Sequence, residues 1–166
     1  MYLEHVNLVV TDMDAMLDFY RAVFPHWRVR DEGHGEWYGK PRKWVHFGDD
    51  ENYLALSDHG EGENRNLKGH SVGLAHFAYV VDNLDAVVAR LNKVGYAIAK
   101  PGAIEPFRKN VYFVDPAGFE VEFVEYLSDI PAERNLNRDA QQSVERQQNG
   151  ACDEGCRCIS FCFGQY

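Results

Sequence analysis

Apolar and polar residues alternate near the start of the chain. Val6, Leu8 and Val10 fall on one face of an extended strand, while His5 and Asn7 fall on the other. The apolar face of such a strand packs on a core, so the side chains of its other face are free to contact solvent or a ligand. The sequence therefore predicts a half-buried strand that carries a histidine on its outer face.

The apolar spacing then changes to the helical period. Apolar residues recur every three or four positions over residues 13–24, after the capping candidates Thr11 and Asp12 and before Pro25. The same order returns later in the chain, where an alternating segment that begins at Leu74 precedes a helical stripe over residues 84–94. Each half of the chain is thus predicted to begin with one strand and one helix.

The two halves are copies of each other. HVNLVVTDMDA from His5 aligns without gaps with HFAYVVDNLDA from His76, and VHFGDDENYLALS from Val45 aligns with VYFVDPAGFEVEF from Val111. The chain is therefore a tandem repeat of strand, helix and three strands, in which each half needs its twin to bury its sheet. The predicted strands are residues 2–10, 27–38, 42–48, 52–57, 74–81, 96–101, 109–115 and 119–126.

This pattern predicts an α+β domain over residues 1–127, built from modules 1–57 and 74–127 with a polar linker over 58–73. The remaining residues, 128–166, have few apolar positions and are predicted to form a polar tail rather than a domain. The tail holds all four cysteines in the pattern C-x3-C-x-C-x3-C, which is not the spacing of a zinc finger. Two interpretations of these cysteines stay open. They have a metal or redox role, or they belong to a disordered end of the chain.

Composition narrows the function classes. The chain has 166 residues, of which 45% are hydrophobic and 26% are charged, as in an ordinary globular protein. Its net charge of -9 disfavours nucleic acids and anionic membrane surfaces as partners. No apolar run is long enough to span a membrane, and the N-terminus lacks the basic region of a secretory signal. We expect a cytoplasmic protein that acts on a small molecule.

Candidate metal ligands occupy the face opposite the predicted core. His5 and His76 stand at the same position of the two repeats, and alternation places Glu120 and Glu122 on the corresponding face of the last strand. A single histidine in a strand is usually a half-buried residue without a metal. Core packing, however, does not explain why an imidazole stands at the same position in both repeats. Two histidines and a carboxylate with open positions suit a catalytic divalent metal such as Fe(II).

Three stretches carry a family resemblance. EHVNLVVTDMDAMLDFYRAVF, GLAHFAYVVDNLDAVVARLNKVG and VYFVDPAGFEVEFVE resemble the vicinal oxygen chelate superfamily, which includes glyoxalase I, extradiol dioxygenases, fosfomycin-resistance transferases and bleomycin-resistance proteins. The resemblance covers residues 1–126 and implies two βαβββ modules whose sheets curl around a metal. It also implies that His5, His76 and Glu122 bind this metal, with Fe(II) favoured and Mn(II), Zn(II) or Ni(II) as alternatives.

The family has a fourth ligand position, on the last strand of the first module. Alignment of Asp49 with Asp115 places Leu56 opposite Glu122, and leucine cannot bind a metal. We therefore expect Leu56 to face the metal site. In glyoxalase I the carboxylate at this position also serves as the catalytic base, so the resemblance disfavours that isomerisation here.

Residues 111–122 fit the extradiol dioxygenase signature, although the histidine that this signature has upstream is missing. The signature implies that Tyr112 binds a hydroxyl of the substrate. His46 aligns with Tyr112 and is a candidate proton donor, with His59 and His70 as further candidates for the acid or base.

The favoured function is a metal-dependent, ring-cleaving or related dioxygenase whose substrate chelates the metal through adjacent oxygens. The alternatives are a thiol transferase or lyase of the glyoxalase and fosfomycin-resistance type, and a non-catalytic drug-binding protein of the bleomycin-resistance type. We expect a homodimer. The sequence leaves open whether the two modules of one chain pair together or exchange with those of a partner chain.

Overall fold

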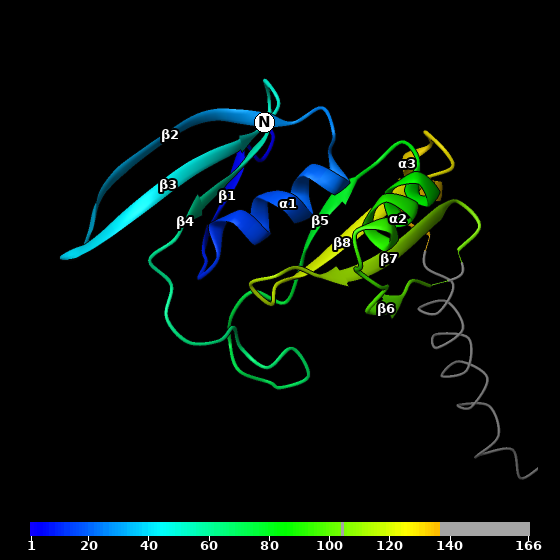
Figure 1. The fold of residues 1–166 in the computed structure, drawn as a ribbon. Helices are drawn as coiled ribbons and strands as arrows, with labels where there is room; N and C mark the ends of the chain where they lie inside the picture. The colour runs from blue at the N-terminus through cyan, green and yellow to red at the C-terminus, as the bar shows by residue number, and fades with distance from the viewer. Residues whose placement is uncertain (104, 137–166) are drawn as a thin grey trace, which may run out of the picture.

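A computed structural model describes residues 1–103 and 105–136 of the chain (Figure 1). The first module contains β1 (His5–Val9), α1 (Met13–Val23), β2 (Arg28–Trp37), β3 (Lys40–Gly48) and β4 (Tyr53–Ser57). The second contains β5 (Phe77–Val80), α2 (Leu84–Lys93), β6 (Lys100–Pro101), β7 (Arg108–Val114) and β8 (Glu120–Tyr126), and the short helix α3 (Pro131–Arg134) follows.

Each module forms its own four-stranded mixed sheet. The strand order is β1-β4-β3-β2 in the first sheet and β5-β8-β7-β6 in the second. β1 runs parallel to β4 and β5 runs parallel to β8, while the other neighbours are antiparallel. This topology confirms the predicted tandem βαβββ repeat. It also leaves β1 and β5 as edge strands of their sheets.

The two long helices begin at equivalent positions because the repeat places a capping residue there. The side chain of Asp12 accepts a hydrogen bond from the backbone N–H of Ala15 at 2.9 Å, and Asn83 accepts one from Ala86 at 2.9 Å. Both caps satisfy a donor of the first helical turn that has no partner within the helix. The observed starts agree with the predicted helices.

The core lies between the helices and one face of each sheet. Its fully buried side chains come from both modules, so the apolar faces predicted by alternation are confirmed: Val10, Met16, Phe19, Tyr20, Val23, Val45, Phe47, Leu54, Leu56, Leu91, Phe113, Val121 and Phe123. The prediction that Leu56 faces the metal site is therefore wrong, because this side chain is 0% exposed within the core. The register instead places Ala55 opposite His46, just as Glu122 lies opposite Tyr112.

The error over Leu56 comes from a difference in turn length. Four residues, 49–52, connect β3 to β4, whereas five residues, 115–119, connect β7 to β8. Aligning Asp49 with Asp115 without a gap therefore shifts the following strand by one residue. A shift of one residue moves every side chain of a strand to the other face.

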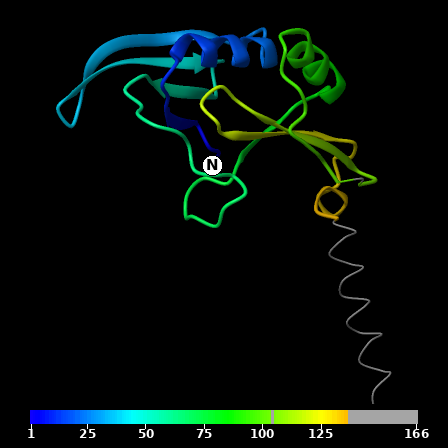
Figure 2. The same cartoon turned by 60° about the horizontal axis from the view of Figure 1, so that its bottom comes forward.

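The modules are joined mainly through their helices, which pack against each other and lie side by side in Figure 2. The Arg90 guanidinium on α2 donates hydrogen bonds to the carbonyl oxygens of Ala22 and Val23, at 2.8 and 2.7 Å. Tyr20 on α1 donates a hydrogen bond to the Asp115 carboxylate in the second module at 3.0 Å. The helix pair thus sets how the two sheets lie relative to each other.

The linker over residues 58–73 forms hydrogen bonds with both modules. The backbone N–H of Gly60 donates to the carbonyl of Val10 at 3.1 Å, and Asn64 donates to the carbonyl of Gly118 at 2.8 Å. The four cysteines of the tail lie outside the described residues. None of the helices in the described part of the chain is long and apolar enough to cross a membrane.

Candidate metal centre

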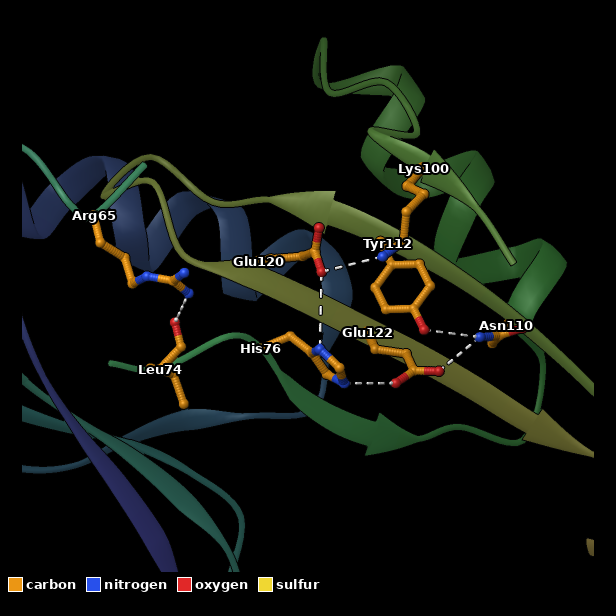
Figure 3. Close-up of polar contacts among 8 residues, drawn as sticks. All are labelled: Arg65, Leu74, His76, Lys100, Asn110, Tyr112, Glu120 and Glu122. Atoms are coloured by element: carbon orange, nitrogen blue, oxygen red, sulfur yellow. Dashed lines mark hydrogen bonds and ion pairs between the residues drawn. The ribbon is translucent and has the colours of Figure 1, made fainter. Parts of the chain in front are cut away.

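The second sheet brings together two of the three predicted ligands (Figure 3). His76 lies just before β5, and Glu122 lies on β8 beside it. Their Nε2 and Oε2 atoms are 3.3 Å apart. Two donors that share a metal at about 2.1 Å each and at near right angles stand about 3 Å apart. The pair therefore fits a metal bound between these two atoms.

The other oxygen of Glu122 is already held. Asn110 on β7 donates a hydrogen bond through Nδ2 to Glu122 Oε1 at 2.7 Å, and the same nitrogen lies 3.3 Å from the Tyr112 hydroxyl. Burial, and then the negative charge of Glu122, raises the pKa of Tyr112 above its usual value. The phenol is therefore protonated at neutral pH and can donate a hydrogen bond to a ligand.

A second carboxylate lies on the other side of His76. Glu120 Oε1 is 3.8 Å from His76 Nδ1 and 3.5 Å from the ammonium of Lys100, and that ammonium lies 3.9 Å from the centre of the Tyr112 ring. Figure 3 shows these side chains around Tyr112 on one face of the sheet. Since metal-bound histidines generally direct their second nitrogen to a carboxylate or carbonyl, Glu120 stands where such a partner is needed.

The first sheet presents His5 in a corresponding way. Its Nδ1 atom lies 3.0 Å from Glu4 Oε2, which leaves Nε2 for another partner, and its ring stacks on Tyr53 with centroids 4.6 Å apart. His46 lies on the other side of Tyr53, at 4.7 Å between centroids. Burial lowers the pKa of His46 and so favours the neutral imidazole at pH 7. The sequence predicts a proton donor here, whereas a neutral imidazole is suited to accept a proton.

One chain does not bring His5 to the His76–Glu122 pair. Within residues 1–103 and 105–136, no three His, Cys, Asp or Glu side chains lie close enough to hold one metal ion. His5 lies on the first sheet, whereas the other two predicted ligands and Tyr112 lie on or next to strands of the second. His59 stacks on Trp37 at 6.2 Å, and His70 lies exposed in the linker.

A cavity of about 760 Å³ opens between the two edge strands. It is bordered by the start of β1, which includes His5, and by the whole of β5. Phe24 and Trp27 from the segment after α1, Tyr79 from β5 and Arg90 from α2 also line it. The edges of both sheets are therefore accessible from this hollow.

Sequence reasoning missed three side chains that shape the site, namely Glu4, Lys100 and Asn110. Strand alternation would have placed Asn110 beside Tyr112, because the two residues are two positions apart on β7. Glu4 and Lys100 had no such signal, since a charged residue next to a turn or at a sheet edge is most often solvated. Their roles depend on contacts between elements that are distant in sequence.

The fold agrees with a family match. A model of the Glyoxalase/Bleomycin resistance protein/Dioxygenase superfamily matches residues 2–123. The chain belongs to this superfamily. The predicted resemblance to the vicinal oxygen chelate proteins is thus confirmed, together with the α+β fold of paired modules. The chain has no match among curated proteins.

Solved structures of the superfamily have the same fold. A glyoxylase/bleomycin resistance protein/dioxygenase domain from Frankia sp. is 23% identical, with a TM-score of 0.62 over 76% of this chain and 98% of its own. A variant of the fosfomycin resistance protein FosX from Listeria monocytogenes, solved with Mn(II) and a dihydroxypropylphosphonic acid, is 17% identical, with a TM-score of 0.60 over 81% and 98%. TnmS3, an antibiotic-binding protein from Streptomyces sp., is 18% identical, with a TM-score of 0.51 over 76% and 96%.

Proposed function

We propose that this protein is a divalent-metal-dependent enzyme in which His5, His76 and Glu122 bind the metal. The observation that carries this proposal is the matching orientation of the two histidines. In both modules Nδ1 faces a carboxylate, that of Glu4 at 3.0 Å or that of Glu120 at 3.8 Å. The other nitrogen, Nε2, is then the one that would bind the metal, and in His76 it lies 3.3 Å from Glu122 Oε2. Such a carboxylate partner is typical of histidines that bind metals.

We infer further that each site is shared between two copies of the chain. β1 and β5 are edge strands, and both carry exposed apolar side chains: Val9 is 48% exposed and Val80 is 66% exposed. An exposed apolar edge is a template for pairing with another strand. A dimer that sets β1 of one chain beside β5 of its partner would bring His5 to the partner's His76 and the partner's Glu122.

The donor set is one that suits Fe(II) or Mn(II), and Fe(II) is the metal we favour. Ala55, which stands where the family has its fourth ligand, cannot bind a metal, so three positions stay open for the substrate. When bound, the metal would act as a Lewis acid toward a substrate that chelates it through two adjacent oxygens. Tyr112 would then donate a hydrogen bond to one of these oxygens, and the neutral His46 would receive a proton.

We propose ring-cleaving or related dioxygenation as the reaction, because the open positions leave room for both the substrate and dioxygen. A second candidate is the opening of an epoxide by water or a thiol. It is favoured by the ammonium of Lys100, which lies beside Tyr112 and could bind an anionic substrate, and by the likeness to FosX. Both reactions use the same three ligands.

The proposal is tested by anaerobic purification, metal analysis, and two assays on the Fe(II)- and Mn(II)-loaded protein. Oxygen uptake with a panel of catechols tests dioxygenation, and the consumption of a phosphonate epoxide with and without thiols tests epoxide opening. We expect about one metal per chain and turnover in the first assay. A protein that holds no divalent metal but binds aromatic compounds would instead be a binding protein, as TnmS3 is described to be.

A further inference from the structure

We propose that Asn110 is a positioning residue, which turns the Glu122 carboxylate toward the metal before the metal arrives. This inference rests on the proposed function, because it assigns a role within the same site. A positioning role requires that the side chain contacts a metal ligand and is itself held in one rotamer. It also requires that the residue type is not explained by the side chain's own hydrogen bonding. The surroundings of Asn110 meet all three conditions.

The contact is direct and well directed. The amide nitrogen of Asn110 lies 2.7 Å from Glu122 Oε1 and 3.3 Å from the Tyr112 hydroxyl, so one NH₂ group serves both the predicted ligand and the predicted substrate-binding phenol. A carboxylate accepts but does not donate, which requires the nitrogen of the amide to face Glu122. Oε1 is thereby occupied, and Oε2 is left toward His76 at 3.3 Å.

The side chain of Asn110 is also held in place by the loop that precedes β7. Asn110 is 8% exposed, and a side chain at Gly102 would overlap both the backbone and the amide oxygen of Asn110. The loop that precedes β7 thus approaches Asn110 as closely as glycine permits. This close approach restricts the rotamers of the amide, so its hydrogen bonds keep their direction.

Only one end of the amide is satisfied by its surroundings. Its oxygen Oδ1 is buried without a hydrogen-bond partner among the described residues. A buried polar atom without a partner costs free energy, and this cost offsets part of what the hydrogen bond to Glu122 contributes. An asparagine whose own oxygen stays unpaired is explained by what its nitrogen does for Glu122.

The test uses the full-length protein, with Mn(II) as the probe and a chelator competition to measure its dissociation constant. We expect Asn110→Leu to weaken Mn(II) binding by about 10-fold to 100-fold, the usual effect of losing a group that orients a metal ligand. The metal-free variant should still unfold cooperatively with a melting temperature near that of the wild type, because loss of the bond to Glu122 is offset in part by removal of the unpaired Oδ1. Asn110→Ser, whose hydroxyl is too short to reach Glu122, should lose affinity in the same way and serves as a second variant.

Asn92→Leu and Asn92→Ser are matched controls, since Asn92 is exposed at the end of α2, and both should bind Mn(II) as the wild type does. If either folded Asn110 variant binds Mn(II) with wild-type affinity, the positioning role is wrong while the proposed function stands. A metal-free melting temperature that falls in step with the affinity would likewise indicate a structural role. A wild-type protein that binds no metal would overturn both proposals.

Discussion

The hydroxyl of Tyr20 donates a buried hydrogen bond to the carboxylate of Asp115, at 3.0 Å, and so ties α1 of the first module to the β7–β8 turn of the second. Asp115 also accepts hydrogen bonds from the backbone N–H groups of Ala117 and Phe119, each at 3.0 Å. Burial nevertheless dominates and raises the pKa of Asp115 to about 6. The carboxylate that joins the modules is therefore partly protonated in mildly acidic solution.

This shift predicts how stability depends on pH. The folded protein binds the proton of Asp115 up to about pH 6, whereas the unfolded chain releases it near pH 4. The free energy of unfolding should therefore fall as the pH rises from about 4 to about 6, by at most about 3 kcal/mol from this group. Asp115→Asn removes the charge, keeps an oxygen for the two backbone N–H groups and turns its NH₂ group toward the Tyr20 hydroxyl, so urea titrations should show a flatter pH dependence over this range.

Asp50→Asn is the matched control, because Asp50 is exposed and paired with Arg28 on the surface. It should leave the difference in unfolding free energy between pH 4 and pH 6 close to that of the wild type. An Asp115→Asn protein with the same pH dependence as the wild type would mean that burial does not raise the pKa of this carboxyl.

Arg90 is the second tie between the modules, and its loss should destabilise the protein. Arg90→Met removes two hydrogen bonds to the carbonyls that end α1 but keeps most of the apolar stem. We expect the free energy of unfolding to fall by about 2 kcal/mol, the usual contribution of hydrogen bonds that involve a charged group. Lys93→Met, at the exposed end of the same helix, should change it little, and equal losses in the two variants would contradict this account.

Most of the fold could be predicted from the sequence, because the two long helices and the strands on the core carry a periodic apolar pattern that occurs twice. β2 and β6 carry no such pattern, and the strand predicted over 96–101 is only Lys100–Pro101. The His76–Glu122 pair could be predicted as well, since alternation assigns both residues to the outer face. What failed was the step from Glu122 to Leu56, where a turn with one extra residue breaks the alignment of the repeats. Asn110 was missed because an amide in a strand gives no chemical signal until its neighbours are known.

The corrected register makes a prediction of its own. Ala55→Glu places a carboxylate opposite His46, on the face that carries His5. It should raise the affinity for Zn(II) or Ni(II) by adding a fourth ligand, and it should depress any oxygen uptake by filling an open position. Leu56→Glu places the same group in the core, where an unpaired charge costs several kcal/mol, and should prevent folding. A folded Leu56→Glu protein with raised metal affinity would restore the rejected register.

The central claim is that His5 of one chain and the His76–Glu122 pair of another hold one metal. It is tested most directly by mixing His5→Ala and His76→Ala chains, unfolding and refolding them together, and measuring bound Mn(II). Each variant alone should bind no Mn(II) tightly. Half of the dimers in an equal mixture are mixed, and each of these regains one intact site, so the mixture should recover about a quarter of the wild-type metal content. A mixture that binds no more Mn(II) than either variant alone, while the wild type binds it tightly, would contradict a site shared between two chains.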